Sequence, residues 1–348
     1  MSIINYISEY ADKRPSRWHT PGHKGTLSQL DVTELVCDSQ LEKEILVAQE
    51  VAAQWYNVDN IQFLTGGSSI GIKAAILASG GDILCFKGCH QAILEGTNLA
   101  KVGYYEYNTG TTSCGLANVV TVGTIRAALK QYPQATAVYI ESPDYYGRIV
   151  DKSVIDAIKA AGKLAFVDAA HGAHFVADSR LKSLCLAPQA DIANLSAHKT
   201  LDAYTQTAYL AINNKTLLSK TKAALKNLGT TSPNYMLLAS LESAIENAKK
   251  YDYDRLYKDI VEFKKQITCM PNGDFTRLVV DARAVDTNGE ALIKYLVNKN
   301  IYAEKFTDNY VVFISTPPDT KNDLDNLSLA IKSFNTDRLK ASKQYNKS

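Results

Sequence analysis

The chain has 348 residues, 46% of them hydrophobic, which is enough for one large core and a smaller second domain. The formal net charge of +2 comes from 38 basic and 36 acidic residues that are interspersed, so no basic block indicates a nucleic-acid-binding surface. No apolar run approaches the roughly 20 residues of a membrane span, and the first residues lack the pattern of a signal peptide. We therefore expect a cytoplasmic protein that binds neither nucleic acid nor membrane.

Short apolar runs that predict strands alternate with periodic patterns that predict helices, which favours an α/β fold with a mainly parallel sheet. The expected helices cover residues 42–56, 71–78, 122–131 and 152–161. The expected strands cover residues 61–64, 83–86, 103–107, 137–140, 164–167, 192–195 and 208–212. Ligands of such sheets bind at the carboxyl ends of the strands. The residues that follow these runs are therefore the candidates for a site.

A long helical stretch over 215–265, interrupted near 229–233, separates this part from a smaller lobe. The lobe is expected to contain strands at 275–280 and 310–314 and helices at 289–299 and 323–334. We thus predict four parts: an N-terminal segment (1–40) that contributes to the active site or dimer, a large domain (41–265), a small C-terminal α/β domain (266–336) and a frayed polar tail (337–348).

Lys199 and Asp168 together indicate a pyridoxal phosphate enzyme. This cofactor needs an amine to hold its aldehyde as a Schiff base and an anion to keep its ring nitrogen protonated. Lys199 follows the strand at 192–195, and Asp168 directly follows the strand at 164–167. Each residue alone also suits an ordinary role, because an aspartate after a strand is often a turn former and a lysine is usually solvated. The hypothesis therefore depends on the surrounding motifs.

The segment 64–73 follows a strand and opens a helix, so its backbone amides and the hydroxyls of Ser68 and Ser69 suit a phosphate at a helix N-terminus. Gly67 lies in the same turn. An ordinary glycine turn with a serine cap is the alternative interpretation. The segment is not a Walker loop, since the Gly-Lys-Ser/Thr ending is missing.

Three further side chains fall at the same predicted sheet edge. His90 follows the strand at 83–86, where its ring is suited to stacking on a pyridine, although a histidine in a loop is more often a surface residue. Ser196 and His198 flank Lys199 closely enough to bring a hydroxyl and an imidazole to the phosphate.

The six cysteines, at positions 37, 85, 89, 114, 185 and 269, include no Cys-x-x-Cys pair, so we expect reduced core thiols. Cys85 and Cys89 beside His90 are conceivable metal ligands. Cys85, however, lies inside an apolar run and a fourth ligand is not evident. We expect no metal site.

Seven motifs occur in an order and spacing that resemble the major domain of the Orn/Lys/Arg decarboxylase family, fold-type I pyridoxal phosphate enzymes of the aspartate aminotransferase superfamily. The motifs are residues 19–25 (HTPGHKG), 30–35 (LDVTEL), 142–147 (SPDYYG), 167–175 (VDAAHGAHF), 196–201 (SAHKTL), 205–208 (TQTA) and 230–235 (TTSPNY), together with the serine-glycine segment at 64–73. The resemblance implies a three-layer sandwich with a small C-terminal lobe.

The resemblance also implies a role for each matching residue. Lys199 is the Schiff-base lysine, Asp168 the partner of the pyridine nitrogen and His90 the ring-stacking residue. The phosphate ligands are Ser68, Ser69, Ser196 and His198, and the further cofactor contacts are Gly67 and Ala170. Members are similar in forming dimers or larger assemblies with shared active sites, so Thr231 or Ser232 is expected to reach the phosphate in the partner subunit.

The leading hypothesis is decarboxylation of lysine, arginine or ornithine, with Lys199, His171 or His90 as the proton donor. Glu141, Asp144 and Glu34 are the candidate carboxylates for the distal amine of the substrate. Two motifs depart from the family, which usually has Asp-Glu-Ala-His at 168–171 and Arg-Asn-x-His at 87–90, and the chain resembles a short form without the usual C-terminal domain. The alternatives are an aminotransferase or lyase of the same fold type, or a non-catalytic subunit that binds the cofactor.

Overall fold

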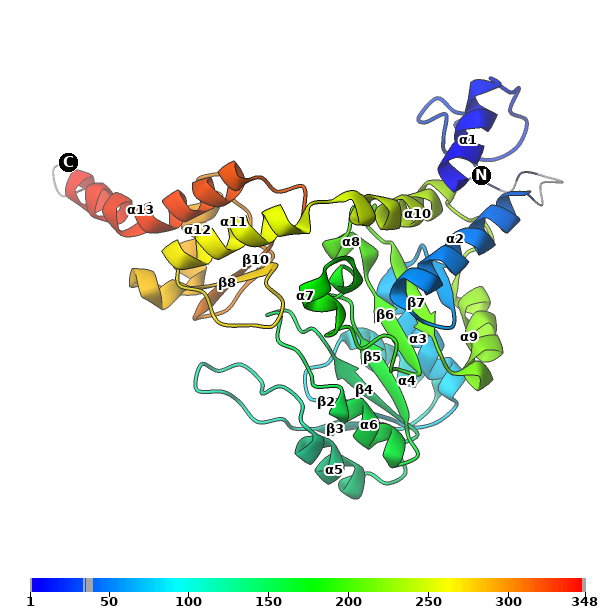
Figure 1. The fold of residues 1–348 in the computed structure, drawn as a ribbon, viewed down its shortest axis with the longest axis horizontal. Helices are drawn as coiled ribbons and strands as arrows, with labels where there is room; N and C mark the ends of the chain where they lie inside the picture. Colours follow the sequence, from blue (N-terminus) through cyan, green and yellow to red (C-terminus); the bar gives the residue numbers. More distant parts are fainter. Residues whose placement is uncertain (1, 34, 36–39, 346–348) are drawn as a thin grey trace. The chain divides into compact units, whose positions relative to one another are not determined.

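A seven-stranded sheet in the order β1-β7-β6-β5-β4-β2-β3 forms the centre of the first of two units (Figure 1). The structure is a computed structural model and describes residues 2–33, 35 and 40–345. β7 runs antiparallel to its neighbours β1 and β6, whereas β2, β3, β4, β5 and β6 pair in parallel. The strands are β1 (Ile61–Leu64), β2 (Ile83–Phe86), β3 (Tyr104–Tyr107), β4 (Ala137–Glu141), β5 (Leu164–Asp168), β6 (Ile192–Leu195) and β7 (Ala208–Ile212). The predicted mainly parallel sheet is confirmed.

Helices cover both faces of this sheet. α3 (Gly67–Ser79) contacts α4 (Gln91–Ala100) and α9 (Lys215–Leu228), and these three helices lie together beside one face (Figure 1). Their apolar side chains share a core with strand residues such as Tyr139 and Phe166. α6 (Ser153–Ala160) contacts β5 and α5 (Val122–Gln131) on the other side. This arrangement is the three-layer sandwich that the sequence predicts.

The N-terminal segment contains a helix that the sequence analysis did not expect. α1 (Ile3–Asp12) begins after Ser2, whose hydroxyl accepts a hydrogen bond from the backbone N–H of Asn5 at 3.2 Å. Ile3 and Ile7 are fully buried in a cluster with residues of α2 (Gln40–Tyr56) and α10 (Tyr235–Lys250). The segment is therefore anchored on the first unit by its own apolar face.

The second unit contains a three-stranded antiparallel sheet in the order β8-β10-β9. It comprises residues 144–149 and everything after Lys250, so the division lies fifteen residues before the expected boundary at 265. The reason is that α11 contacts α13, and the side chain of Gln266 accepts hydrogen bonds from Ser328 and Lys332. The elements are α11 (Tyr253–Gln266), β8 (Arg277–Asp281), η2 (Ala282–Val285), α12 (Gly289–Val297), β9 (Lys305–Phe306), β10 (Tyr310–Ile314) and α13 (Lys321–Tyr345).

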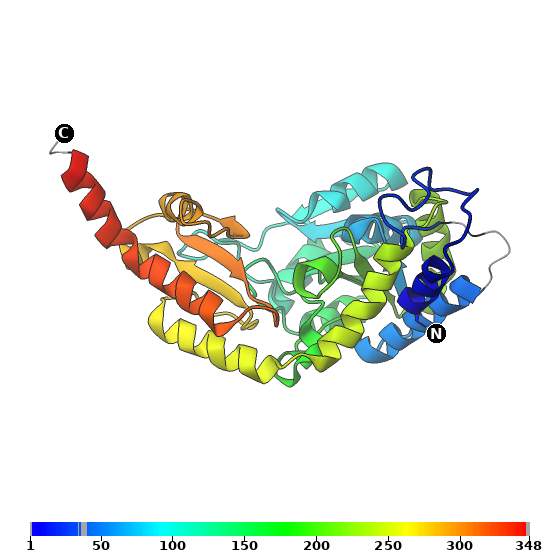
Figure 2. The ribbon, with the colours of Figure 1, turned by 90° about the horizontal axis from the view of Figure 1, so that it is seen from above.

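α13 continues as one helix to Tyr345, through the start of the segment that is expected to be a frayed tail (Figure 2). The segment 335–345 contains neither glycine nor proline, so nothing in it breaks a helix. Asp337 also fixes this part of α13, since its carboxylate accepts hydrogen bonds from the Tyr295 hydroxyl at 2.8 Å and from Lys299 Nζ at 3.0 Å. Among the described residues, no helix has the length and apolarity needed to cross a membrane.

The long helical stretch expected after residue 234 is divided by a cap at Asp252. Its Oδ1 accepts a hydrogen bond from the backbone N–H of Arg255 at 2.9 Å, which starts α11 after the end of α10. We predict that Asp252→Ala removes this bond, frays the first turn of α11 and exposes the Arg255 amide to solvent. A cap is worth about 1 kcal/mol, which corresponds to roughly fivefold faster amide hydrogen exchange. Asp252→Asn keeps an acceptor and should keep the protection. Unchanged exchange at Arg255 in the alanine variant would contradict this role.

Candidate active site

Lys199 and His171 meet at the carboxyl edge of the sheet. Lys199 lies in the short helix α8 (Ala197–Thr200), which directly follows β6, and His171 lies in the turn after β5. The Nζ of Lys199 is 3.2 Å from Nε2 of His171, a hydrogen-bonding distance. His171 is 2% exposed, whereas Lys199 is half-buried. Two residues that are 28 positions apart therefore form one amine–imidazole pair.

Asp168 is the last residue of β5 and is 7% exposed. Its Oδ1 accepts a hydrogen bond from the backbone N–H of Ala170 at 3.1 Å. Burial raises the pKa of the Asp168 carboxyl above its ordinary value, while the Ala170 N–H and the positive charges of Lys199 and His90 act in the opposite direction. A protonated ring nitrogen placed against this carboxylate would add a further compensating positive charge.

The N-terminus of α3 provides the groups for an anion. Gly67 has φ +76°, a left-handed conformation that favours glycine, and starts the helix four residues before the expected position at 71. Ser68 has a buried Oγ that makes no hydrogen bond within the described part of the chain, and Ser69 follows it in the first turn. A buried hydroxyl without a partner at a helix N-terminus suits the phosphate of pyridoxal phosphate.

Ser196 and His198 lie beside Lys199 on the same edge of the sheet. The Oγ of Ser196 is 3.3 Å from Nδ1 of His198, and this nitrogen is also 3.0 Å from the carbonyl oxygen of Thr207. Because a carbonyl only accepts, Nδ1 carries the proton that is donated to Thr207. This hydrogen bond to Thr207 orients the imidazole of His198 beside Lys199.

His90 caps a helix at the end of the next strand. It is the N-cap of α4, where its Nδ1 accepts a hydrogen bond from the backbone N–H of Ala92 at 3.1 Å. The side chain is exposed. His90 lies at the same edge of the sheet as Asp168, because β2, β4 and β5 pair in parallel and both residues fall at carboxyl ends of strands.

The other residues predicted for the site do not all remain candidates. Glu141 ends β4 and pairs in register with Asp168, so it stays a candidate for the substrate amine. Asp144 does not, because its carboxylate already binds Arg148 at 2.6 Å and accepts the backbone N–H of Tyr146. Glu34 lies outside the described residues. Ser232 lies in the exposed turn between α9 and α10.

Asn194 is a residue that the sequence analysis missed. It is fully buried on β6 and pairs in register with Asp168. A Cβ at Gly71 would lie 2.3 Å from its Oδ1 and 2.8 Å from Cδ1 of Leu64, which explains why glycine allows α3 to pack here. The signal was present as a single polar residue inside the apolar run 192–195.

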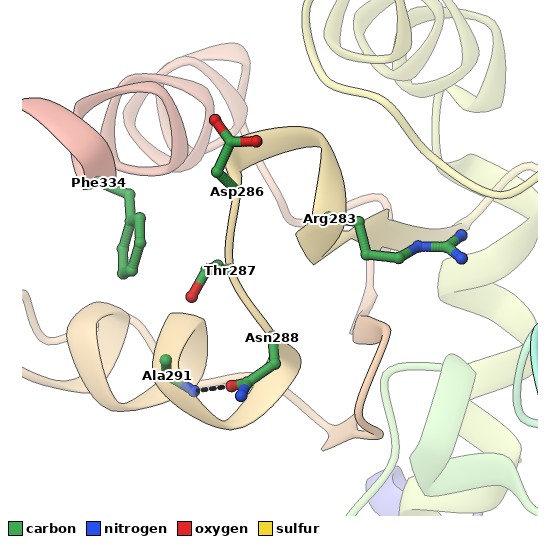
Figure 3. A pocket seen from close by; sticks show the side chains of 6 residues that line it. All are labelled: Arg283, Asp286, Thr287, Asn288, Ala291 and Phe334. Atoms are coloured by element: carbon green, nitrogen blue, oxygen red, sulfur yellow. Dashed lines mark hydrogen bonds between the residues drawn. The ribbon is translucent and has the colours of Figure 1, made fainter.

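A hollow in the second unit is a poorer candidate. It is lined by Arg283, Asp286, Thr287, Asn288, Ala291 and Phe334 (Figure 3). Arg283 binds Asp281 through two hydrogen bonds, at 2.9 and 2.7 Å, and the side chain of Asn288 accepts the backbone N–H of Ala291 at 2.8 Å. These polar groups are already used within the protein, so the hollow offers little to fix a ligand.

Comparison with known families shows which family this chain belongs to. Residues 28–286, which are 259 of the 348 residues, match the Orn/Lys/Arg decarboxylase major domain. The chain belongs to this family. The match includes every residue placed at the sheet edge above, from Gly67 to Lys199.

Two relatives from Bacillus subtilis (strain 168) illustrate the similarity within the Orn/Lys/Arg decarboxylase family. The uncharacterised protein YaaO is 28% identical to this chain, and the match covers 90% of this chain and 73% of YaaO. An arginine decarboxylase is 24% identical, and the match covers 93% of this chain and 75% of that enzyme.

Solved structures show the same fold. The lysine decarboxylase LdcF of Francisella novicida superposes with a TM-score of 0.81 at 17% identity, over 96% of this chain and 60% of LdcF. A structure of SPT with PLP superposes with a TM-score of 0.68 at 13% identity, over 96% of this chain and 83% of SPT. The fold is therefore fold-type I, and the chain spans about 60% of the length of the lysine decarboxylase.

We predict that Asp168→Asn stabilises the protein without cofactor at neutral pH. The folded-state pKa of Asp168 is raised, so the native state binds more protons than the unfolded state between the unfolded and folded pKa values. Stability therefore falls as pH rises through this interval, and the loss persists above it. Asparagine carries no charge and should give a higher melting temperature than aspartate at pH 7. The difference should shrink as the pH falls toward the unfolded value of about 4. A variant that melts below the wild type at pH 7 would show that the Lys199 charge outweighs burial.

Proposed function

We propose that this chain decarboxylates a basic amino acid, namely lysine, arginine or ornithine, with pyridoxal phosphate bound to Lys199. The observation that carries the proposal is the contact between Lys199 Nζ and His171 Nε2 at 3.2 Å, next to the buried carboxylate of Asp168. Family membership supports the reaction class, because the family is named for the decarboxylation of these three amino acids.

The described residues suit the cofactor at both of its ends. Ser68 and Ser69 at the N-terminus of α3, with Ser196 and His198 beside Lys199, would hold the phosphate. Asp168 would accept a hydrogen bond from the protonated ring nitrogen. When bound, pyridoxal phosphate accepts the electron pair that is left when the carboxylate of the substrate departs.

Lys199 and His171 move protons around this group. An amine must be neutral to attack an aldehyde, and Nε2 of His171 is close enough to take the proton from Lys199 Nζ. The same pair can return a proton to the substrate carbon after carbon dioxide has left. His171 is almost fully buried, which keeps this proton away from bulk water. We therefore favour the Lys199–His171 pair over the exposed His90 as the proton donor.

We propose that Glu141 recognises the distal positive group of the substrate. It lies in register with Asp168 at the end of β4, and its carboxylate is suited to a distal ammonium or guanidinium group.

We also propose that the chain forms a homodimer with shared active sites. Trp18 and Leu27 in the N-terminal segment are 92% and 84% exposed, and large apolar side chains so exposed favour contact with another subunit.

The decisive experiment incubates the purified protein and pyridoxal phosphate with each common amino acid. Mass spectrometry then identifies an amine, a keto acid or no product. We expect lysine, arginine or ornithine to give the corresponding amine and carbon dioxide without any keto acid acceptor. A reaction that requires 2-oxoglutarate or pyruvate would identify an aminotransferase. Bound cofactor without turnover of any amino acid would favour a non-catalytic subunit.

The cofactor lysine is tested in the same preparation. Borohydride reduction followed by peptide mapping should place the cofactor on Lys199, and Lys199→Ala should remove turnover. Asp168→Asn should still bind the cofactor but lose turnover by about a hundredfold, which corresponds to about 3 kcal/mol of electrostatic stabilisation. Lys182→Ala, in α7 (Ser179–Lys182), is the matched control and should behave as wild type. A cofactor adduct on another lysine would overturn the assignment.

We predict that Ser68→Ala weakens cofactor binding without weakening the fold. Its Oγ makes no hydrogen bond with any residue that the structure describes, so its removal leaves none of them without a partner. A hydrogen bond to a charged phosphate is worth about 1.5–3 kcal/mol, so the dissociation constant should rise roughly 10- to 100-fold. Ser79→Ala at the other end of α3 is the control, because Ser79 Oγ donates only to its own helix. Equal affinities of both variants would exclude Ser68 as a phosphate ligand.

A further inference from the structure

Two thiols are in direct contact at the turn that leads into His90. Cys85 lies on β2 and Cys89 lies in the turn that follows, and their Sγ atoms are 3.2 Å apart. The turn is closed by a hydrogen bond from the backbone N–H of Cys89 to the carbonyl of Phe86, at 3.2 Å. Gly88 adopts φ +89° within it, which favours glycine. The backbone therefore folds back so that the two sulfurs meet.

The two cysteines differ in access to solvent. Cys85 is fully buried in the core beside α3, whereas Cys89 is half-buried and packs on the edge of this core. The Tyr104 hydroxyl lies 3.5 Å from the Sγ of Cys89 and donates to the carboxylate of Glu106 at 2.7 Å. Cys89 is therefore the more accessible of the two thiols.

The pKa values of the two thiols also differ. The hydrogen bond with Cys85 lowers the pKa of the Cys89 thiol. The same bond and burial raise the pKa of Cys85. By contrast, burial raises the pKa of Cys269, another half-buried cysteine, to about 11. Because the thiolate is the reactive form, Cys89 is the more nucleophilic of these thiols at neutral pH.

We propose that Cys85 and Cys89 are a modification site, which a small disulfide such as glutathione disulfide converts reversibly into a Cys85–Cys89 disulfide. The thiolate of Cys89 attacks one sulfur of the small disulfide, which releases one thiolate and leaves a mixed disulfide on Cys89. Cys85 then loses its proton and attacks the Sγ of Cys89, which releases the second small thiol. Two protein thiols are oxidised and one small disulfide is reduced to two thiols, so electrons and protons balance.

The consequence for the site follows from the position of His90. A disulfide holds its sulfurs about 2.05 Å apart, so oxidation draws the two Sγ atoms together by roughly 1 Å. Cys85 is fixed in a packed strand, so the turn at 87–89 must move. His90 directly follows this turn, and its ring is held by the cap bond to Ala92. Oxidation should therefore displace the His90 ring.

The effect on turnover rests on the proposed function, whereas the disulfide itself does not. We therefore measure disulfide formation and turnover separately. The holoenzyme is reduced, freed of reductant and treated with glutathione disulfide. Trypsin cleaves after Lys87, between the two cysteines, so Cys85 lies on peptide 74–87 and Cys89 on peptide 88–101. After alkylation of the remaining thiols, these two peptides stay joined only if the disulfide has formed.

We expect joined peptides in the wild type and in the control Cys269→Ser, and none in Cys89→Ser. Cys85→Ser should accumulate the mixed disulfide with glutathione on Cys89. Separate, fully alkylated peptides from the oxidised wild type would overturn the disulfide, whatever the turnover. Because the wild type alone gives this result, a variant that fails to fold does not affect the test.

The link to His90 has its own outcome. Displacement of a cofactor contact by about 1 Å should lower turnover by up to about a hundredfold, and dithiothreitol should restore it. Cys89→Ser should not respond to glutathione disulfide. Joined peptides with unchanged turnover and unchanged cofactor dissociation would overturn the link. If neither redox state shows turnover, the proposed function fails, and cofactor dissociation still tests the displacement.

Discussion

Desolvation of the Asp168 carboxylate constrains the whole catalytic edge of this protein. A buried negative charge is stable only beside positive charge or hydrogen-bond donors. The chain supplies these from two neighbouring strand ends: the Ala170 amide after β5 and Lys199 after β6. The parallel register of β4, β5 and β6 holds these ends level. A shift of one strand by one residue would turn the corresponding side chains to the opposite face.

Packing of α3 against the same strands connects this charge to the phosphate end of the site. Gly71 allows the helix to approach Asn194, which is the neighbour of Asp168 on β6. The packing of α3 on these strands therefore also positions the helix N-terminus, where the Ser68 hydroxyl makes no hydrogen bond with any described residue. The two ends of the proposed cofactor would thus be held by elements that belong to one packed core.

The sequence predicted this edge well because its strands are short apolar runs, each followed by a polar residue. Asp168, His90 and Lys199 could be placed in this way before any coordinates were known. The end of α13 could not, since the bonds that fix Asp337 come from α12. The contact between Cys85 and Cys89 was also hidden, because it depends on the left-handed turn at Gly88. Asn194 was visible in the sequence but had no expected partner there.

The membership of Asp144–Ile149 in the second unit has a consequence for the order of folding during synthesis. This segment leaves the ribosome long before the residues that bind it. The carbonyl of Gly147 accepts the amides of Gly273 and Asp274, and the side chain of Asn272 donates to the carbonyl of Tyr146. The sheet of the first unit can close around β4 and β5 before the segment 144–149, which lies between these strands, has formed its hydrogen bonds to residues 272–274. The hydrogen bonds between this segment and residues 272–274 can form only after the chain has been made past Asp274.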